Sequence, residues 1–162
     1  MPIELNRRDL LGAAGVGAVA LLFTRVPASA KPVRFQVTLS DAEWRKRLGA
    51  ERYAVLRKAA TERPFSSPLD HEKRKGVYVC AGCRLPLYPS TTKFDSGTGW
   101  PSFYAPLKNA VITRTDRSLV FERTEVLCRR CGGHLGHVFD DGPPPTGLRY
   151  CMNGLALQFR PV

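Results

Sequence analysis

The chain has 162 residues, of which 43% are hydrophobic and 24% charged, and its formal net charge is +11 at pH 7. This length suffices for one domain with a buried core. An excess of lysine and arginine over acidic residues is common in proteins that bind nucleic acids. The lysines and arginines are dispersed, however, and the sequence contains no nucleic-acid-binding motif. The charge therefore indicates a solvated basic surface and no nucleic-acid partner.

Residues 1–30 have the pattern of an export signal. A twin arginine stands at positions 7 and 8, an apolar run follows over residues 10–23, and Ala-Ser-Ala at 28–30 supplies a cleavage site. The apolar run is shorter than the ~20 residues that a bilayer-spanning helix needs. We therefore expect a twin-arginine signal peptide, with an ordinary secretory signal as the alternative. Cleavage would leave residues 31–162 as a domain in the bacterial periplasm or outside the cell, without stable membrane insertion.

Helical patterns occupy the first part of the remaining chain. Ser40, followed by Glu43 three residues later, forms a capping box, which predicts a helix from Asp41 to about Leu48. Apolar residues at helical spacing predict a second helix over residues 50–61. This helix should end before Pro64, because the residue that precedes a proline avoids helical backbone angles.

Strand-like patterns dominate from Gly76 onward. Residues 110–114 and 119–127 resemble the two strands of a hairpin, joined through residues 115–117. Further short strands, separated by turns rich in glycine and proline, are expected at 77–79, 135–139, 149–151 and 155–159. The sequence therefore predicts a mainly β domain with antiparallel strands and helices at its N-terminus.

Four of the five cysteines form two pairs with identical spacing. Cys80 and Cys83 make one Cys-x-x-Cys pair, and Cys128 and Cys131 make the other. Two such pairs separated by a long insert predict one tetrahedral zinc site. Two disulfides are the alternative. Because four thiolates fill the coordination sphere, the zinc would be structural and not catalytic. Cys151 is then the one thiol left for chemistry.

Three segments concentrate reactive and aromatic side chains: residues 93–104, 132–143 and 148–157. Together they supply the thiol of Cys151, a neighbouring arginine, two histidines, an acid and several aromatic rings. This combination suits a thiol nucleophile that acts on a neutral, methyl-bearing substrate.

At these segments the chain resembles the B-type methionine sulfoxide reductases, which reduce methionine-R-sulfoxide. The resemblance covers most of residues 31–162. It is tightest at Gly-Trp-Pro-Ser-Phe (99–103), Gly-His-Leu-Gly-His-Val-Phe (133–139) and Arg-Tyr-Cys-Met-Asn (149–153). The resemblance implies two antiparallel sheets in a barrel-like arrangement, small N-terminal helices and a structural zinc site with four cysteine ligands. It also implies an oxidoreductase that repairs oxidised methionine in proteins.

The resemblance assigns roles to individual residues. Cys151 matches the catalytic cysteine, and Trp100 matches the tryptophan that packs against the S-methyl group of the substrate. His137 matches the histidine that hydrogen-bonds the sulfoxide region, with Asp141 close behind it. The same active-site set contains His134, Arg149 and Asn153. A core position or extra metal ligation is the alternative for the two histidines, and a core position is the alternative for Trp100. Capping of the proline-rich turn is the alternative for Asp141.

Sulfoxide reduction needs a soft nucleophile at sulfur and a proton donor at oxygen. Cys151 must react as a thiolate, so either its pKa is lowered or the substrate triggers its ionisation. Arg149, two residues away on the same strand face, would supply positive charge, and His137 can donate to the oxygen. The products are methionine and a Cys151 sulfenic acid. A thiol peroxidase-like activity and a non-catalytic, zinc-stabilised binding module are the alternative functions.

The chain departs from the family pattern in two places. Thr98 occupies the position where many members carry a resolving cysteine, and no cysteine remains elsewhere once four bind zinc. The sulfenic acid would then be reduced by an external thiol, either a small thiol or a thioredoxin-like protein. Residues 154–157 read Gly-Leu-Ala-Leu where the family has a serine-rich segment. This difference bears on the reaction rate and the substrate range.

We expect the protein to be a monomer.

Overall fold

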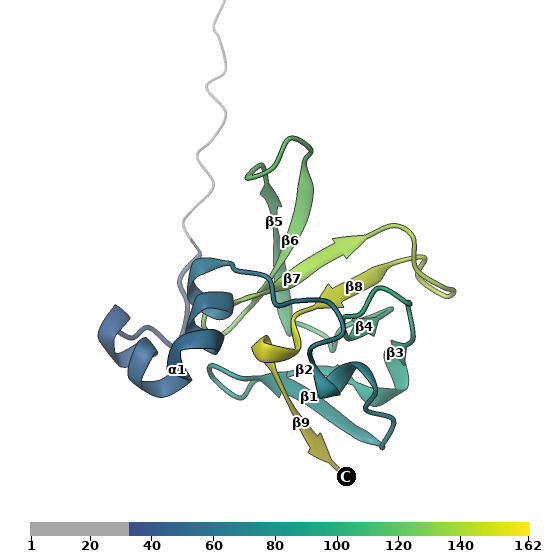
Figure 1. Ribbon diagram of the computed structural model, residues 1–162, viewed down its shortest axis with the longest axis horizontal. Helices are drawn as coiled ribbons and strands as arrows, with labels where there is room; N and C mark the ends of the chain where they lie inside the picture. Colours follow the sequence, from purple (N-terminus) through teal and green to yellow (C-terminus); the bar gives the residue numbers. More distant parts are fainter. Residues whose placement is uncertain (1–32) are drawn as a thin grey trace, which may run out of the picture. The chain divides into compact units, whose positions relative to one another are not determined.

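The computed structural model describes residues 33–162, which form two antiparallel sheets and one kinked helix (Figure 1). The predicted signal peptide of residues 1–30 lies outside the described residues. Within the described part, no helix has both the length and the hydropathy that crossing a membrane requires. The mainly β fold class expected from the sequence is confirmed.

Helix α1 spans Asp41–Lys58 and begins with the predicted capping box. The backbone N–H of Ser40 donates to Glu43 Oε2 over 2.8 Å, and Glu43 N–H donates to Ser40 Oγ over 3.3 Å. Gly49 adopts φ 72° and ψ 173°, which divides α1 into two segments at the predicted boundary. The second segment ends at Lys58 and not at residue 61, because Ala59 turns into the left-handed region with φ 55°.

The smaller sheet has the strand order β2-β1-β9, and the larger has the order β3-β4-β8-β7-β6-β5. Every pair of neighbouring strands is antiparallel. The short 3-10 helix η1 (Pro68–Asp70) lies between α1 and β1, and η2 (Ser90–Thr92) and η3 (Gly154–Ala156) lie between strands. The strands are β1 (Gly76–Cys80), β2 (Pro86–Pro89), β3 (Lys93–Phe94), β4 (Ser102–Phe103), β5 (Val111–Asp116), β6 (Arg123–Cys128), β7 (His134–Phe139), β8 (Arg149–Met152) and β9 (Leu157–Pro161).

The hairpin of β5 and β6 differs from its prediction. Its strands stay paired as far as Asp116 opposite Arg123, so the turn falls at 117–122 and not at 115–117. A salt bridge of 2.7 Å between these two side chains closes the last pair. Likewise, the last strand begins at Leu157 and not at residue 155, because η3 occupies the preceding residues.

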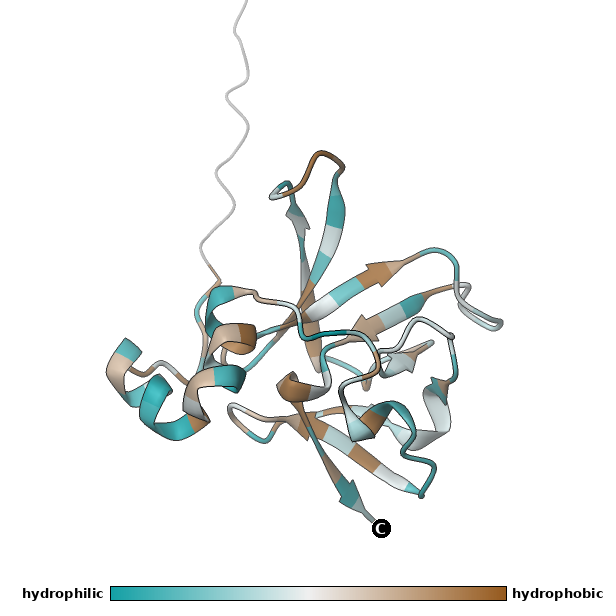
Figure 2. Cartoon of the chain, in the orientation of Figure 1, coloured by the Kyte–Doolittle hydropathy of each residue, from teal (hydrophilic) through white to brown (hydrophobic). Residues whose placement is uncertain are grey.

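Aromatic rings join the two sheets in the core. Tyr78 and Tyr88 come from the smaller sheet, and Phe103 of the larger sheet packs against both rings, with centroid distances of 4.9 and 4.4 Å. All three side chains are fully buried. The Tyr88 hydroxyl donates to the sulfur of Met152 over 3.1 Å. This contact fixes the buried side chain of Met152 on β8. Because neighbouring side chains of a strand alternate between its faces, Cys151 points to the opposite face. Hydrophobic residues alternate with paler and hydrophilic ones along the strands (Figure 2).

Candidate active site and metal centre

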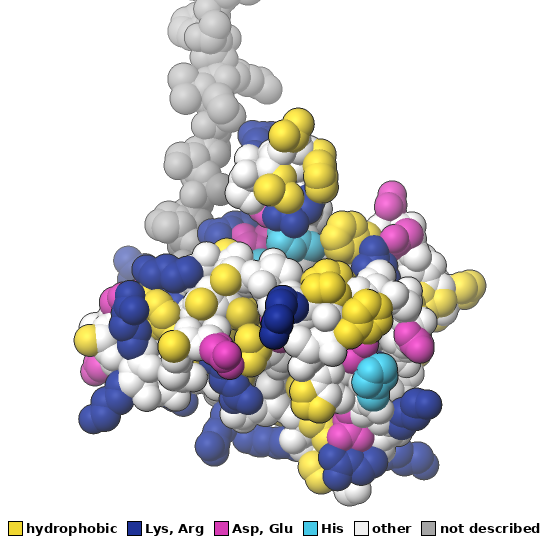
Figure 3. Space-filling view, viewed as in Figure 1, with side chains coloured by type: hydrophobic (Ala, Val, Ile, Leu, Met, Phe, Trp, Pro, Cys, Tyr) yellow, Lys and Arg dark blue, Asp and Glu magenta, His cyan; other side chains and the backbone are white. Residues whose placement is uncertain are grey.

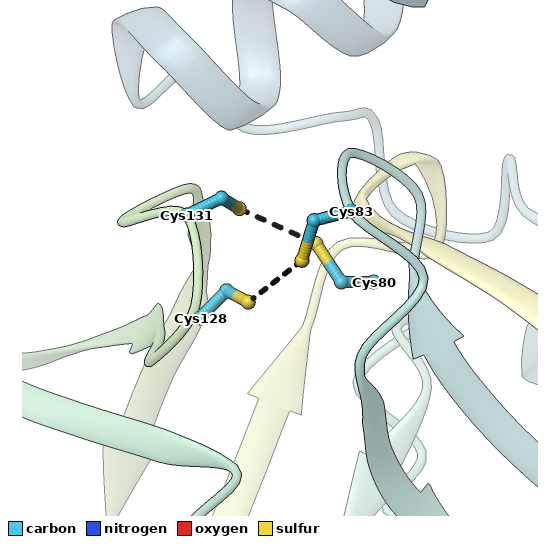
Figure 4. Close-up of side chains that lie close together, drawn as sticks. All are labelled: Cys80, Cys83, Cys128 and Cys131. Atoms are coloured by element: carbon cyan, nitrogen blue, oxygen red, sulfur yellow. Dashed lines mark hydrogen bonds between the residues drawn. The ribbon is translucent and has the colours of Figure 1, made fainter. Parts of the chain in front are cut away.

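The four paired cysteines meet at one buried cluster (Figure 4). Their sulfur atoms all lie within 4.8 Å of one another, and the closest pairs are Cys80 with Cys131 at 3.7 Å and Cys83 with Cys128 at 3.5 Å. A disulfide would bring two sulfurs to about 2.05 Å. A tetrahedral ion with metal–sulfur bonds of about 2.3 Å separates them by about 3.8 Å. The cluster thus has the geometry of a metal site, and the alternative of two disulfides does not fit it.

Two similar backbone turns present these thiols. In the first, Arg84 N–H donates to the Cys80 carbonyl over 2.8 Å, and Arg84 has φ 61°. In the second, Gly132 N–H donates to the Cys128 carbonyl over 2.8 Å, and Gly132 has φ 67°. Each turn follows the end of a strand, β1 or β6, so the cluster ties the smaller sheet to the larger one. A tetrahedral ion held by these four sulfurs would have no open position for a substrate.

Cys151 lies on β8, outside this cluster, and is partly exposed. Burial raises the pKa of the Cys151 thiol, although Thr98 and Arg149 each act to lower it. Thr98 Oγ1 lies 3.9 Å from the Cys151 sulfur, so the side chain at this position faces the thiol.

Arg149 and Asp141 form a bidentate ion pair. The guanidinium Nε and one Nη donate to the two carboxylate oxygens over 2.8 and 2.7 Å. The guanidinium also lies over the ring of Phe139, 4.5 Å from its centroid. Asp141 thus holds Arg149, which stands two residues before Cys151 on β8, and the carboxylate lowers the net positive charge near the thiol.

His137 lies on β7 directly opposite Cys151 in the strand register. Its Nε2 is 2.8 Å from Asp116 Oδ2, on the neighbouring hairpin, and that carboxylate also accepts from Arg123. Burial lowers the pKa of His137, and the hydrogen bond to Asp116 partly opposes this effect. Burial thus favours the neutral imidazole, and the neutral tautomer that donates Nε2–H to Asp116 has Nδ1 as an acceptor.

His134 lies behind His137 and is buried. Its Nδ1 is 2.6 Å from Glu125 Oε1, and its ring packs edge-on against that of His137 with centroids 5.4 Å apart. It is not among the side chains that line the pocket beside the thiol. The structure thus places His134 where it supports His137.

A small pocket of about 120 Å³ lies over the Cys151 thiol. The predicted residues Trp100, His137 and Asn153 line it together with Cys151. The Trp100 indole N–H donates to the Glu62 carbonyl over 3.1 Å, and Asn153 Oδ1 accepts from Glu62 N–H over 3.0 Å. Sequence reasoning did not identify four further lining residues, which are Thr61, Arg123, Gly136 and Phe139.

Glu62 is a further residue that sequence reasoning did not identify. Its buried carboxylate accepts from the backbone N–H groups of Gly154 and Leu155 over 2.5 and 2.8 Å. Burial raises the pKa of Glu62. Through its side chain and its backbone this residue fixes η3, Asn153 and the Trp100 ring in one arrangement. The sequence offered no local signal for it, because every partner except Trp100 comes more than ninety residues later.

Comparisons with known proteins agree with this geometry. The SelR domain family matches residues 48–161. The chain is 53% identical over 128 residues to a peptide methionine sulfoxide reductase MsrB of Agrobacterium fabrum, covering 78% of this chain and 95% of that protein. It is 57% identical over 120 residues to the protein of the same name in Pseudomonas putida, covering 74% and 90%. A protein of that name in Leptospira interrogans is 51% identical over 129 residues, covering 79% and 98%.

Proposed function

The chain belongs to the SelR domain family and is a B-type peptide methionine sulfoxide reductase, and from this we propose that Cys151 is the nucleophile that reduces the R epimer of methionine sulfoxide in proteins. The observation that carries the proposal is the pocket in which Trp100 and His137 stand beside the Cys151 thiol. An indole wall suits the S-methyl group, and a polar group on the other side suits the oxygen.

The first step transfers oxygen from one sulfur to the other. The Cys151 sulfur attacks the sulfoxide sulfur, the S–O bond of the substrate breaks, and the oxygen ends on Cys151 as a sulfenic acid. Cysteine loses two electrons and the substrate gains them, so methionine leaves as the reduced product. The aromatic rings of Trp100 and Phe139 would hold the methyl group during this step.

His137 would move the proton that this step requires. Because Asp116 accepts from Nε2–H, the free Nδ1 of the neutral ring can take the thiol proton. Asp116 then stabilises the resulting imidazolium, which returns the proton to the sulfoxide oxygen as negative charge develops there. Burial raises the pKa of the resting Cys151 thiol. A proton acceptor such as His137 would therefore be needed to form the reactive thiolate.

The second half of the cycle would use an external reductant. The first thiol condenses with the sulfenic acid, releasing water and leaving a mixed disulfide, and the second thiol releases Cys151 as a disulfide forms between the two reductant sulfurs. Thr98 faces the Cys151 sulfur at 3.9 Å, which supports its placement in the resolving-cysteine position. A thioredoxin-like protein or a small thiol would serve as reductant.

We also propose that zinc occupies the cluster of four cysteines, where four thiolate donors match its tetrahedral preference. The ion would stabilise the joint between the two sheets and leave the chemistry to Cys151. The twin-arginine pattern at positions 7 and 8 supports export to the periplasm or beyond, where the domain would act as a monomer on oxidised envelope proteins.

The proposed activity is tested by assaying both sulfoxide epimers of N-blocked methionine with dithiothreitol, using the zinc-loaded protein and its Cys151→Ser variant. The proposal requires turnover of the R epimer alone, and loss of that turnover in the variant while the fold is kept. Equal reduction by the variant would show that another group is the nucleophile.

A further inference from the structure

Three consecutive large apolar side chains project from the turn of the β5–β6 hairpin. Leu119, Val120 and Phe121 have exposed fractions of 50%, 107% and 62%. The other large hydrophobic residues exposed in the described part of the chain are isolated in sequence. The hairpin rises from the body of the domain, with this apolar turn at its end (Figures 2 and 3). We call these three residues the hairpin tip.

The hairpin is continuous with the catalytic pocket. Arg123, the first residue of β6, lines the pocket, and Asp116, the last residue of β5, holds His137. Phe121 precedes Arg123 by two residues, so their Cα atoms lie at most about 7 Å apart. The base of the hairpin therefore borders the pocket through Arg123, and Phe121 is the tip residue nearest to it along the chain.

The pocket has room for one side chain of a polypeptide substrate. Its volume of about 120 Å³ suits the reacting group of one methionine sulfoxide, so the neighbouring residues of the substrate must lie outside it. An extended chain advances about 3.3 Å per residue. Residues two or three positions from the sulfoxide would thus reach the hairpin tip.

The charges of the hairpin indicate which partner the tip fits. Its three arginines are each paired with a carboxylate of the same hairpin, and the pairs are Arg114 with Glu125, Arg117 with Glu122, and Arg123 with Asp116. The hairpin is thus electrically neutral within a chain of net charge +11. A surface that binds anionic lipids carries unpaired lysines or arginines beside its apolar residues. The hairpin has no unpaired lysine or arginine. A neutral apolar tip fits apolar side chains of another polypeptide.

We propose that the hairpin tip binds apolar residues that flank the methionine sulfoxide in a polypeptide substrate. Methionine packs among apolar residues in protein cores, and its oxidation disrupts that packing. A sulfoxide that becomes accessible therefore comes with exposed apolar neighbours. The tip makes the enzyme selective for such segments, while the pocket alone recognises the sulfoxide. This inference rests on the proposed function of the pocket.

The test replaces the tip with polar residues by the combined substitutions Leu119→Ser, Val120→Ser and Phe121→Ser. Three substrates are compared: N-blocked methionine sulfoxide, a peptide with leucine and valine around the sulfoxide, and a peptide with serine and glycine there. For the apolar peptide we expect kcat/KM to fall about tenfold, mainly through KM, because about 1.4 kcal/mol of apolar contact is lost. The other two substrates should keep their wild-type kcat/KM.

A matched control carries Val33→Ser and Val162→Ser, which remove exposed apolar side chains that do not line the pocket. This control should leave all three substrates unchanged. An unchanged kcat/KM for the apolar peptide in the tip variant, or an equal loss on all three substrates, would overturn the inference. Tip-dependent sedimentation with anionic vesicles, together with unchanged peptide kinetics, would assign the tip to a membrane instead. Absence of wild-type turnover of blocked methionine sulfoxide would refute the proposed function itself.

Discussion

The Asp116 carboxylate lies 2.8 Å from Nε2 of His137, the residue paired with Cys151 across β7 and β8. Arg123 donates to the same carboxylate oxygen over 2.7 Å, so the end of the β5–β6 hairpin holds the imidazole through its Nε2 atom. The imidazole of His137 thus connects the surface hairpin to the strand that carries the Cys151 thiol.

Asp116→Asn should lower kcat by about 100-fold, because the asparagine amide can donate to Nε2 and so stabilise the wrong tautomer of His137. It should also move the NMR titration midpoint of His137 to lower pH, since Asp116 raises the pKa of His137 while burial, Arg123 and His134 lower it. Asp140→Asn is the matched control, because Asp140 is exposed in the bend directly after β7, the strand that contains His137. An unaltered His137 titration would contradict the proposed role of Asp116.

Alkylation of Cys151 by iodoacetamide should be slow at pH 7 and accelerate above the ordinary thiol pKa of about 8.5. The reason is that burial raises the pKa of the Cys151 thiol in the resting enzyme. Arg149→Gln should shift the rate profile to still higher pH, because Arg149 lowers that pKa. Arg160→Gln, a change at an exposed arginine of β9, should leave the profile in place. Rapid alkylation of the wild type at pH 6 would show that the thiol is already ionised.

Glu62→Ala should destabilise the domain by about 2–4 kcal/mol, because two buried backbone N–H groups lose their acceptor. These are the N–H groups of Gly154 and Leu155. Glu62→Gln keeps one acceptor oxygen and should recover part of the loss. Urea unfolding measures the change in free energy, and equal stability of the alanine variant and the wild type would exclude this role for Glu62.

Cys128→Ser should release the metal and unfold the domain, since it removes one of four ligands from the cluster that joins the sheets. Elemental analysis should find one zinc per chain in the wild type and in Cys151→Ser, and none in Cys128→Ser. Thermal unfolding monitored by circular dichroism completes the comparison. A stable, metal-free Cys128→Ser domain would mean that the cluster is dispensable for the fold.

Local signals in the sequence predicted much of this architecture. The capping box at Ser40 and Glu43, the break at Gly49 and the spacing of the cysteine pairs each act over a few residues, so the sequence reveals them directly. Asp116 was assigned to a hairpin turn, because its role depends on strand register and on a histidine twenty-one residues later. Glu62 was overlooked for the same reason. Residues that position a catalytic group from another element leave no local pattern.

In the proposed reaction, Cys151 alone takes the oxygen from the substrate, without a resolving cysteine. This step is tested most directly by a single turnover without reductant, in which methionine is quantified and the protein is analysed by mass spectrometry after trapping with dimedone. We expect one methionine per chain and one dimedone adduct, located at Cys151. An intramolecular disulfide at Cys151, or methionine formed without modification of this residue, would contradict it.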